Sequence, residues 1–381
     1  MGEMNHKKIK DTTVNKKKKR VLKKRFYIII PMILMVFTVI ITGSVFSVFY
    51  HYYGMLDTRE GELLDAEEMS ANMTEFQEDE GEEFASDAEV ISEEELAVLE
   101  QEMATGIEEI KNAEKTEADI TNILLIGVDS RKNSFTGRSD AMILVSLNKD
   151  TKTVLMTSFL RDMYVSIPDY GNNRLNAAYA FGGTTLLSET ISLNFGIDVD
   201  KCVVVNFYLV MDVVNALGGV DVTISADEIR VMNEYIESHN NLLGNPKGTD
   251  VIPQSAAGVN HLNGSQALAY SRVRYVGTDF ARTGRQREII SLCLDKMKTM
   301  SLGELNTLME TVLPKVRTDL TETDCAELLL TAVSLGDYTI DNMTIPMDGT
   351  WSSANINGMS VLRVDFKANS EAWHQKQSEV D

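Results

Sequence analysis

An uncharged, almost wholly apolar run over residues 26–50 constrains this chain more than any other feature. About 20 apolar residues are enough to cross a bilayer, and the run is too long and too uniform for a buried core helix. A cleaved signal peptide is the alternative, but its apolar core is usually shorter, and no A-x-A-like cleavage site follows. The sequence therefore predicts a single transmembrane helix at 26–50.

Charge is distributed very unevenly around this predicted span. Residues 1–25 hold eleven Lys/Arg and two acids, whereas residues 51–119 hold 24 Asp/Glu and three Lys/Arg. Because positively charged flanks stay in the cytoplasm, we expect a basic cytoplasmic tail and an extracytoplasmic chain from residue 51 onward. That is the topology of a single-pass type II (signal-anchor) protein of the cell membrane. Beside a membrane span, the basic tail favours contact with anionic lipid over nucleic acid.

The acidity of the chain belongs to one segment. Residues 51–119 have a net charge of −21, which equals the formal charge of the whole protein, so the remainder is nearly balanced. We expect an acidic linker at 51–117, disordered from 54 to about 87, because large apolar residues are few there. An apolar stripe at helical spacing predicts a helix at 91–115, either a stalk or a short coiled coil. The stripe consists of Leu96, Leu99, Met103, Ile107 and Ile110.

Cysteines and common catalytic motifs exclude several classes of protein. Cys202, Cys293 and Cys325 are far apart and form no CxxC or His/Cys cluster, which gives no sign of a zinc site. An odd number of cysteines argues against a disulfide framework. The sequence also contains no GxSxG, HExxH or P-loop motif.

From residue 118 onward, strand patterns alternate with helical patterns. This alternation predicts an α/β protein layered around a central sheet. The first predicted strands are the apolar runs 122–128, 141–147 and 153–160. We place the main domain at 118–300, with a polar surface excursion at 226–254, and a C-terminal helical extension and tail at 301–381.

Charged residues stand at the ends of the three predicted strands. Asp129 follows the first, Arg138 and Asp140 precede the second, and Arg161 follows the third. In α/β sheets, ligands are commonly held at strand ends. Carboxylates suit a hard divalent cation and guanidinium forks match phosphate oxygens, so one interpretation is a site for a cation and a phosphate. Ordinary ion pairs at turns are the alternative.

A second group of basic residues follows later in the chain. In an extended backbone, Arg272 and Arg274 point to the same face. The helix predicted after them places Arg282, Arg285 and Gln286 on one face. Basic residues in the first turns oppose the helix dipole, which suggests an anion at this site. A solvated charged face is the alternative interpretation.

Taken together, these segments resemble the LytR-CpsA-Psr family of cell-wall ligases over residues 120–300. The similar motifs are NILLIGVDSR, GRSDAMILVSLN, SFLRDMYVSIP, RLNAAYAFGG, ALGGVDV, HLNGSQALAYSRVRY and DFARTGRQRE. The resemblance implies a three-layer α/β/α sandwich that binds a polyprenyl-pyrophosphate-linked glycan with Mg²⁺ (or Mn²⁺). It further implies transfer of the glycan phosphate to a peptidoglycan hydroxyl during cell wall biogenesis.

The resemblance also implies a role for each charged residue. Asp129 and Asp140 match the metal carboxylates of the family. The residues that match the catalytic pyrophosphate clamp are Arg138, Arg161, Arg272, Arg274 and Arg282. The predicted substrate-binding residues are Gln286, Arg285, Asn176 and Arg174, the last at a position where relatives often have Lys.

The two substrates leave further questions open. The acceptor hydroxyl belongs to the second substrate, and Asp129, Arg161 or a metal-bound water would deprotonate or orient it. An apolar groove for the lipid is expected around residues 177–187 and 209–214, although such residues also suit a simple core.

Three functions stay open at this point: a glycan phosphotransferase, a pyrophosphatase acting on the same substrate, and a non-catalytic lipid-pyrophosphate binder or envelope regulator. Direct DNA binding is disfavoured, because no helix-turn-helix signal appears and the charged site is predicted outside the membrane. The sequence determines neither the glycopolymer, a teichoic acid or capsular-type polysaccharide, nor the oligomeric state.

Overall fold

The computed structural model describes residues 47–79, 90–113, 120–129, 134–273, 276, 279–334 and 338–378. It separates Met1–Met55 from a second unit, Leu56–Asp381. Among the described residues, no helix has the length and apolar character needed to cross a bilayer. The predicted basic tail, 1–25, lies outside the described residues, as does the predicted span except for residues 47–50, which are helical.

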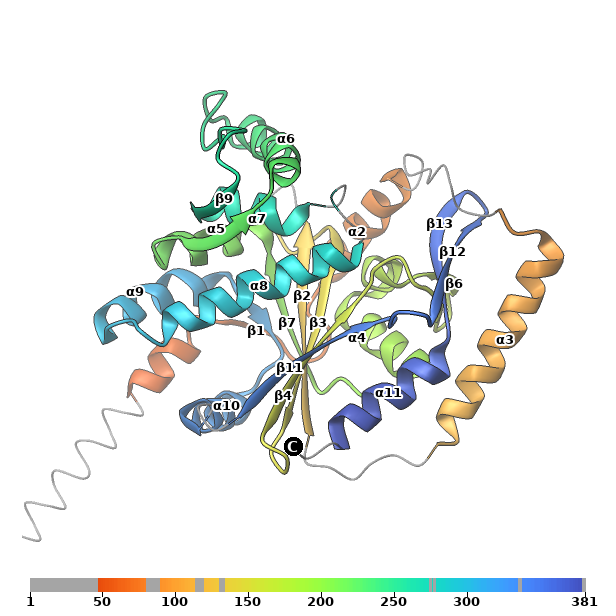
Figure 1. Ribbon diagram of the computed structural model, residues 1–381. Helices are drawn as coiled ribbons and strands as arrows, with labels where there is room; N and C mark the ends of the chain where they lie inside the picture. The colour runs from red at the N-terminus through yellow and green to blue at the C-terminus, as the bar shows by residue number, and fades with distance from the viewer. Residues whose placement is uncertain are drawn as a thin grey trace, which may run out of the picture. The chain divides into compact units, whose positions relative to one another are not determined.

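The unit Leu56–Asp381 is built on a seven-stranded mixed sheet (Figure 1). Its strands, in spatial order, are β1 (Asp57–Thr58), β10 (Arg317–Thr318), β7 (Lys201–Asn206), β2 (Ile120–Asp129), β3 (Arg138–Asn148), β4 (Thr153–Phe159) and β11 (Thr339–Ile345). β3 is antiparallel to both β2 and β4, while β7 is parallel to β2 and β11 is parallel to β4. β2, β3 and β4 carry near-continuous apolar runs because both faces of the sheet are covered.

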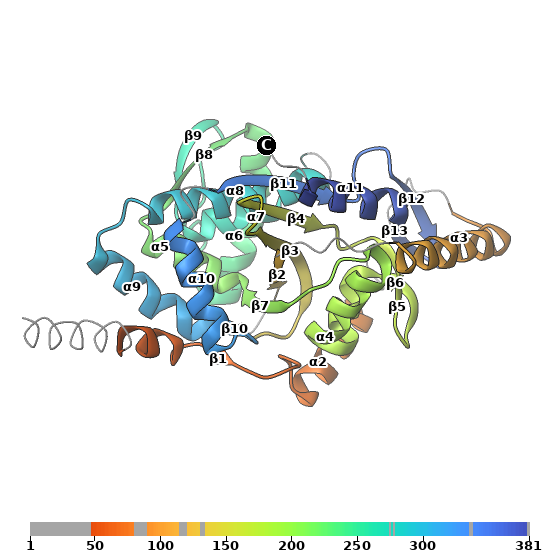
Figure 2. The same cartoon turned by 90° about the horizontal axis from the view of Figure 1, so that it is seen from below.

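Helices cover both faces of this sheet (Figures 1 and 2). The α-helices are α2 (Ala66–Asp79), α3 (Glu93–Lys111), α4 (Leu175–Phe195), α5 (Phe207–Ala216), α6 (Ala226–Leu243), α7 (Gly264–Arg272), α8 (Asp279–Met297), α9 (Leu302–Val312), α10 (Glu322–Ser334) and α11 (Phe366–Ser378), with a 3-10 turn at Leu313–Lys315. Neighbouring residues of β4 show the two layers: Trp373 of α11 donates a hydrogen bond to Thr157, and Arg287 of α8 donates one to Ser158. The α/β prediction is therefore confirmed, with a mixed central sheet.

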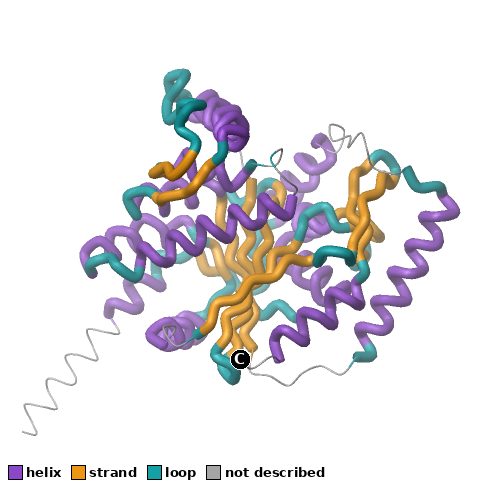
Figure 3. The backbone as a smooth tube through the Cα atoms, viewed as in Figure 1, coloured by secondary structure: helices purple, strands orange, loops and turns teal. Residues whose placement is uncertain are grey.

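Two-stranded sheets lie apart from the central sheet (Figure 3). They are β5 (Tyr164–Ile167) with β6 (Gly171–Arg174), β8 (Val220–Ile224) with β9 (Gly258–Leu262), and β12 (Trp351–Ile356) with β13 (Met359–Val364). β8, β9 and α5 to α8 enclose a second hydrophobic cluster that includes Ile229, Val231, Met232 and Ile236 of α6. The prediction of a polar surface excursion at 226–254 is thus wrong for α6, which buries one apolar face.

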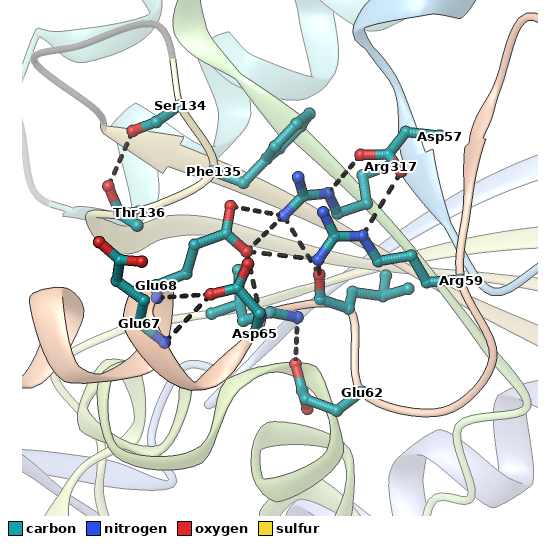
Figure 4. Close-up of polar contacts among 12 residues, drawn as sticks. Asp57, Arg59, Glu62, Asp65, Glu67, Glu68, Ser134, Phe135, Thr136 and Arg317 are labelled. Atoms are coloured by element: carbon teal, nitrogen blue, oxygen red, sulfur yellow. Dashed lines mark hydrogen bonds and ion pairs between the residues drawn. The ribbon is translucent and has the colours of Figure 1, made fainter.

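The acidic linker prediction is wrong for residues 56–79, which we call the strap. Its β1 pairs with β10, and Leu63 and Leu64, 0% and 3% exposed, belong to the main hydrophobic core. Buried Arg317 supplies the compensating charge by binding the carboxylates of Asp57 and Glu68 (Figure 4). Acidic side chains that find a buried cation can be ordered in spite of their composition.

The predicted helix at 91–115 is present as α3, and its stripe is buried against the domain. Ser92 and Glu95 form a capping box at its start. Leu99, Met103 and Ile110 belong to the main core, where α3 packs on α4 and α11. In this structure α3 is therefore an integral helix of the domain rather than a stalk or coiled coil.

The prediction of a separate C-terminal helical extension at 301–381 is also wrong. β10 and β11 both belong to the central sheet, and α11 buries Trp373 in the main core. β11 is an edge strand with the sequence TIDNMTI. Its polar residues interrupt the alternation of apolar and polar side chains that would have marked it as a strand.

If the strap is part of the fold, shortening one of its buried side chains must cost stability. Leu63→Ala should lower the free energy of unfolding by about 2–5 kcal/mol, since it leaves a cavity in the core. Leu330→Ala is the matched control, because Leu330 is 73% exposed. Urea unfolding of both variants of the full chain measures the difference, and equal stability of the two would mean that the strap is not packed.

Candidate functional site

Charged residues gather at one edge of the central sheet. β2 and β4 both run antiparallel to β3, so the ends of β2 and β4 meet the start of β3. Asp129 ends β2, opposite Arg138, the first residue of β3. A register shift between Gly127 and Val128 leaves Asp140 as the extra residue of a bulge. The bulge re-aims this carboxylate toward the residues that follow β4.

Arg161 and Asp140 form a buried ion pair. Nη1 of Arg161 lies 2.5 Å from Oδ1 of Asp140, and the two residues are 2% and 8% exposed. Nε of Arg161 also lies 3.3 Å from Asp162, whose same carboxylate oxygen is 3.9 Å from Nη1 of Arg174. The structure therefore brings three of the predicted residues, Arg161, Asp140 and Arg174, into one network around Asp162.

The N-terminal end of α4 contributes the next residues. Arg174 is its N-cap residue and is 4% exposed. Asn176, 1% exposed, donates its backbone N–H to the carbonyl of Arg161. No described residue makes a hydrogen bond with the side-chain amide of Asn176. Its unmet hydrogen-bonding capacity suits a residue that binds a polar ligand.

Helix α8 reaches the same cluster through Arg282. This residue is 3% exposed, and its Nη1 donates to the backbone carbonyl of Asp140 over 3.1 Å. One turn further along α8, Oε1 of Gln286 is buried and has no hydrogen-bond partner among the described residues. α8 thus brings the guanidinium of Arg282 to the cluster, and the predicted role of Gln286 stays a prediction.

Arg272 is held in a cage of four side chains. Its Nη2 lies 2.6 Å from Oδ2 of Asp129, and its Nη1 lies 2.9 Å from Nε2 of His239. The rings of Phe207 and Tyr235 lie 5.3 and 5.2 Å from the guanidinium carbon. His239, Phe207 and Tyr235 carry no signal in the sequence, because only the fold brings them to Arg272.

His239 accepts the hydrogen bond from Arg272 and is therefore neutral at Nε2. Burial and, second, the neighbouring Arg272 charge lower the pKa of His239 to about 4. A charged imidazole at this place would face the guanidinium with no lone pair to offer it. The neutral form consequently fixes the orientation of Arg272.

The predictions for Arg272 and Arg274 have different outcomes. Arg272 is the last residue of α7, so its backbone is helical rather than extended. Arg274 lies outside the described residues, and its predicted pairing with Arg272 stays a prediction.

Arg285 has a structural role instead of the predicted substrate-binding role. Its Nε lies 2.8 Å from Glu228, and its two other nitrogens donate to the carbonyls of Val273 and Val276. The hydrogen bonds from Ser225 and Arg285 outweigh the effect of burial and lower the pKa of Glu228. Because each guanidinium nitrogen already has an acceptor, Arg285 anchors α6 to α8.

The strap contacts the loop that leads into Arg138, and Figure 4 shows Phe135 of this loop beside Arg317, which binds the acids of the strap. The amide oxygen of Asn72 in α2 accepts a hydrogen bond from the backbone N–H of Gly137. The Phe135 ring lies 4.1 Å from the guanidinium carbon of Arg317, and its carbonyl accepts from Tyr179 at 2.9 Å. Gly137 has a φ of 137°, and a Cβ there would lie 2.4 Å from the Asp129 carbonyl. The loop therefore needs glycine at this position, and its conformation depends on the strap.

The donor set of the cluster limits which metal it can hold. Among the residues that the structure describes, no group of three or more His, Cys, Asp or Glu side chains is arranged as a metal site. Asp129 and Asp140 supply hard carboxylate oxygens from neighbouring strands. Mg²⁺ is commonly bound by one or two carboxylates together with substrate phosphates. The two acids fit such a site, in which the substrate completes the coordination.

The fold and the charged cluster define a class of protein, and comparison with known proteins identifies the family. A mixed α/β sheet with arginines and acids at one edge defines a protein suited to binding a polyanion. The sequence model of the LytR_cpsA_psr family matches residues 86–378. The chain therefore belongs to the LytR_cpsA_psr family, as the motifs predicted.

Relatives and solved structures agree with this assignment. The chain is 37% identical over 205 residues to "Polyisoprenyl-teichoic acid--peptidoglycan teichoic acid transferase TagT" of Bacillus subtilis, over 52% of this chain and 60% of that protein. It is 35% identical to "Biofilm regulatory protein A" of Streptococcus mutans, over 52% of this chain and 50% of that protein. The structure "TagT bound to LIIa-WTA" gives a TM-score of 0.53 at 27% identity, over 70% of this chain and 93% of that one. The chain thus spans only part of these two curated relatives.

The low pKa of His239 predicts a defined pH dependence of stability. Between pH 6.5 and about 4, the unfolded chain binds a proton at His239 that the folded chain does not. Stability should therefore fall as the pH falls through this window, by up to roughly 3 kcal/mol from this residue. The substitution His239→Gln should remove the part of the stability loss that comes from this imidazole.

His261 offers a control with the opposite sign. Hydrogen bonds to Asp221 and Gly218 raise the pKa of this exposed imidazole, so it contributes stability that is lost as the pH rises. Urea unfolding of wild type, His239→Gln and His261→Gln at pH 7 and pH 4.5 separates the two. An unchanged pH dependence in His239→Gln would show that the imidazole is not buried in its neutral form.

Proposed function

We propose that this chain is a membrane-anchored extracytoplasmic phosphotransferase. Its donor is a glycopolymer, of teichoic acid or capsular type, on a polyprenyl-pyrophosphate carrier, and its acceptor is a peptidoglycan hydroxyl. The observation that carries the proposal is the gathering of Arg161, Arg174, Arg272 and Arg282 around Asp129 and Asp140. Membership of the family, and its relatives that are named teichoic acid transferases, support the reaction class. The charge asymmetry across residues 26–50 supports the anchor and its orientation.

Arginines in this cluster are suited to a phosphoryl transfer. Two nitrogens of each guanidinium are fixed: Arg161 contacts the carboxylates of Asp140 and Asp162, and Arg272 contacts Asp129 and His239. A pyrophosphate placed against this cluster would be bound by the positive charges of Arg161 and Arg272 together with that of Arg282. Neutralising charge on the phosphoryl oxygens and aligning the two substrates is most of what this reaction requires.

The proposed step conserves atoms and charge. The acceptor hydroxyl oxygen bonds to the phosphorus on the glycan side, and the bond from that phosphorus to the bridging oxygen breaks. Polyprenyl phosphate leaves with the bridging oxygen and its electron pair. The hydroxyl proton passes to a carboxylate of the cluster, where the Asp129 side chain is 24% exposed and that of Asp140 is 9% exposed. Asp129 is therefore the more accessible base.

Asp129 and Asp140 would also hold Mg²⁺ (or Mn²⁺) when the substrate is bound. The ion supplies additional positive charge at the phosphoryl oxygens. The carboxylates that would bind it already orient Arg272 and Arg161, so the same acids serve both purposes.

The predicted lipid groove falls on helix segments whose apolar residues differ in burial. Ala177, Ala180 and Leu187 of α4 are 0% exposed, and Leu209 and Val214 of α5 are 3% and 0% exposed. These side chains form core, whereas Phe181 of α4 and Val210, Met211 and Val213 of α5 are partly exposed, so the groove at 177–187 and 209–214 stays a prediction.

Binding of the pyrophosphate should depend on Arg272 far more than stability does. Arg272→Ala removes a charge-assisted contact worth about 1.5–3 kcal/mol, which corresponds to a loss in affinity of roughly tenfold or more. Thermal stability should fall less than in a variant of Arg285, because the side chains of Arg272 and Asp129 are 23% and 24% exposed whereas those of Arg285 and Glu228 are 9% and 14% exposed. Titration of the full chain with a polyprenyl pyrophosphate, followed by intrinsic fluorescence, measures the affinity.

Arg285→Ala is the matched control for this experiment. It should leave affinity nearly unchanged and lower stability, since Glu228 and two backbone carbonyls lose a buried donor, at about 1–3 kcal/mol each. The opposite pattern in the two variants would show that Arg272 is structural and would remove the pyrophosphate site from this edge of the sheet.

Metal binding should require the lipid substrate. Because the protein offers two carboxylates, Mn²⁺ followed by electron paramagnetic resonance should bind weakly to the full chain alone and tightly after polyprenyl pyrophosphate is added. Asp129→Asn should weaken the metal bound in the presence of lipid. Asp140→Ala is a poor test, because it would leave buried Arg161 without its main partner and cost stability. Equal metal binding by wild type and Asp129→Asn would contradict the metal assignment.

A further inference from the structure

Several cavities of about 410 to 560 Å³ lie on the domain, and one of them flanks the edge strand β11. This 560 Å³ cavity lies between α8 and α11. Its lining includes Phe280 and Arg287 of α8, Asn342 and Thr344 of β11, Asp348 after β11, and Lys376 of α11. We call it the β11 cavity. Neither the sequence motifs nor the comparisons assign it a ligand.

Arg287 is the feature of this cavity that needs explanation. Its Nη1 lies 2.5 Å from the hydroxyl of Ser158 and 3.1 Å from that of Thr344. Within the described part of the chain it has no carboxylate partner, whereas Arg161, Arg285 and Arg317 each bind one. Burial lowers the pKa of Arg287, which reports the cost of keeping this charge away from water.

Most donors of this guanidinium are still available. Hydrogen bonds to described residues leave only from Nη1, so Nε and Nη2 keep their N–H groups for another acceptor. The guanidinium of Arg287 is half-buried beside a cavity and has only neutral hydroxyls as partners among the described residues. An anionic ligand in the cavity would supply the opposite charge that it lacks.

One end of the β11 cavity adjoins the charged cluster. β11 is parallel to β4, and the N–H of Leu160 donates to the carbonyl of Ile345 over 2.9 Å. Asp348 therefore follows β11 at the edge where Arg161 follows β4. α8 also links the two places, since it carries Arg282 in the cluster and Arg287 in the cavity.

The surroundings of Arg287 favour a single negative charge over a phosphate dianion. Lys376 already binds Asp341 at 2.5 Å, and exposed Asp348 adds a negative charge at the lining. Asn342 and Thr344 offer neutral polar groups, and Phe280 offers an apolar surface. β11 is an edge strand, so its outer backbone groups can pair with an added extended chain.

We propose that the β11 cavity is an acceptor subsite that binds an extended peptide through a free carboxylate held by Arg287. The assignment to the acceptor rests on the proposed function, because peptidoglycan carries short peptides with free carboxylates close to its sugar hydroxyls. A peptide that runs from Arg287 toward Asp348 would place the attached sugar toward Arg161 and Asp140, because Asp348 follows β11 at that edge of the sheet.

The test uses an N-acetylated tripeptide with a free C-terminal carboxylate and the same tripeptide as its C-terminal amide. The full chain should bind the acid at least tenfold more tightly than the amide by calorimetry. Arg287→Gln should abolish this preference, and Arg230→Gln, which changes an exposed arginine on α6, should keep it. An equal acid preference in Arg287→Gln, or no preference in wild type, would overturn the proposal.

Two further measurements separate the alternatives. Inorganic phosphate should displace the acid peptide less well than acetate does, and the reverse would make the cavity a phosphate site. If Arg287→Gln does not fold, Arg287→Lys takes its place: it keeps the charge but loses the fork, and should reduce the acid preference severalfold. An unreduced preference in Arg287→Lys would contradict recognition by the guanidinium.

Failure of the subsite and failure of the proposed function look different. In a transfer assay, Arg287→Gln should raise the KM for peptidoglycan and leave the affinity for polyprenyl pyrophosphate unchanged. Wild-type protein that binds the acid peptide but transfers no glycan would refute the proposed function and leave the peptide site intact. Wild-type protein that transfers glycan with the same KM as Arg287→Gln would refute the subsite alone.

Discussion

The buried ion pair between Arg161 and Asp140 organises the charged edge of this protein. Two charges with little access to water are stable only when each stays close to the other, so the end of β4 is fixed against the bulge in β3. Arg282 adds a donor to the backbone of the same bulge, and Arg174 approaches through Asp162. The guanidinium groups are thereby positioned before any ligand arrives, which is the condition for effective electrostatic stabilisation of a phosphoryl transfer.

The gathering of these residues followed from the sequence, because strand ends of neighbouring strands must meet. Asp129, Asp140 and Arg161 each flank an apolar run, and the order of the runs brought them together. Helical spacing was less informative. It placed Arg282 and Arg285 on one face of α8, yet Arg285 binds Glu228 of α6. Spacing within a helix cannot show which partner a distant helix will supply.

Long-range partners also explain what the sequence did not reveal. The strap has the composition of a disordered linker, but Arg317, far along the chain, binds its acids. His239 gave no signal, since its role exists only beside Arg272. β11 has polar residues in its middle and becomes a strand by pairing with β4, where Thr339 faces Thr153. In each case the deciding interaction joins residues that are far apart in the sequence, where local patterns carry no information.

The proposed function requires that the charged edge of the sheet transfers the glycan phosphate to peptidoglycan. The most direct measurement follows a label in the glycan-side phosphate of a polyprenyl-pyrophosphate-linked glycan, incubated with peptidoglycan and the full chain in lipid vesicles. We predict that the label becomes covalently attached to peptidoglycan with wild-type protein, and that Arg272→Ala abolishes this attachment. Release of the label as phosphate or soluble glycan phosphate, with none on peptidoglycan, would contradict the account and favour a pyrophosphatase.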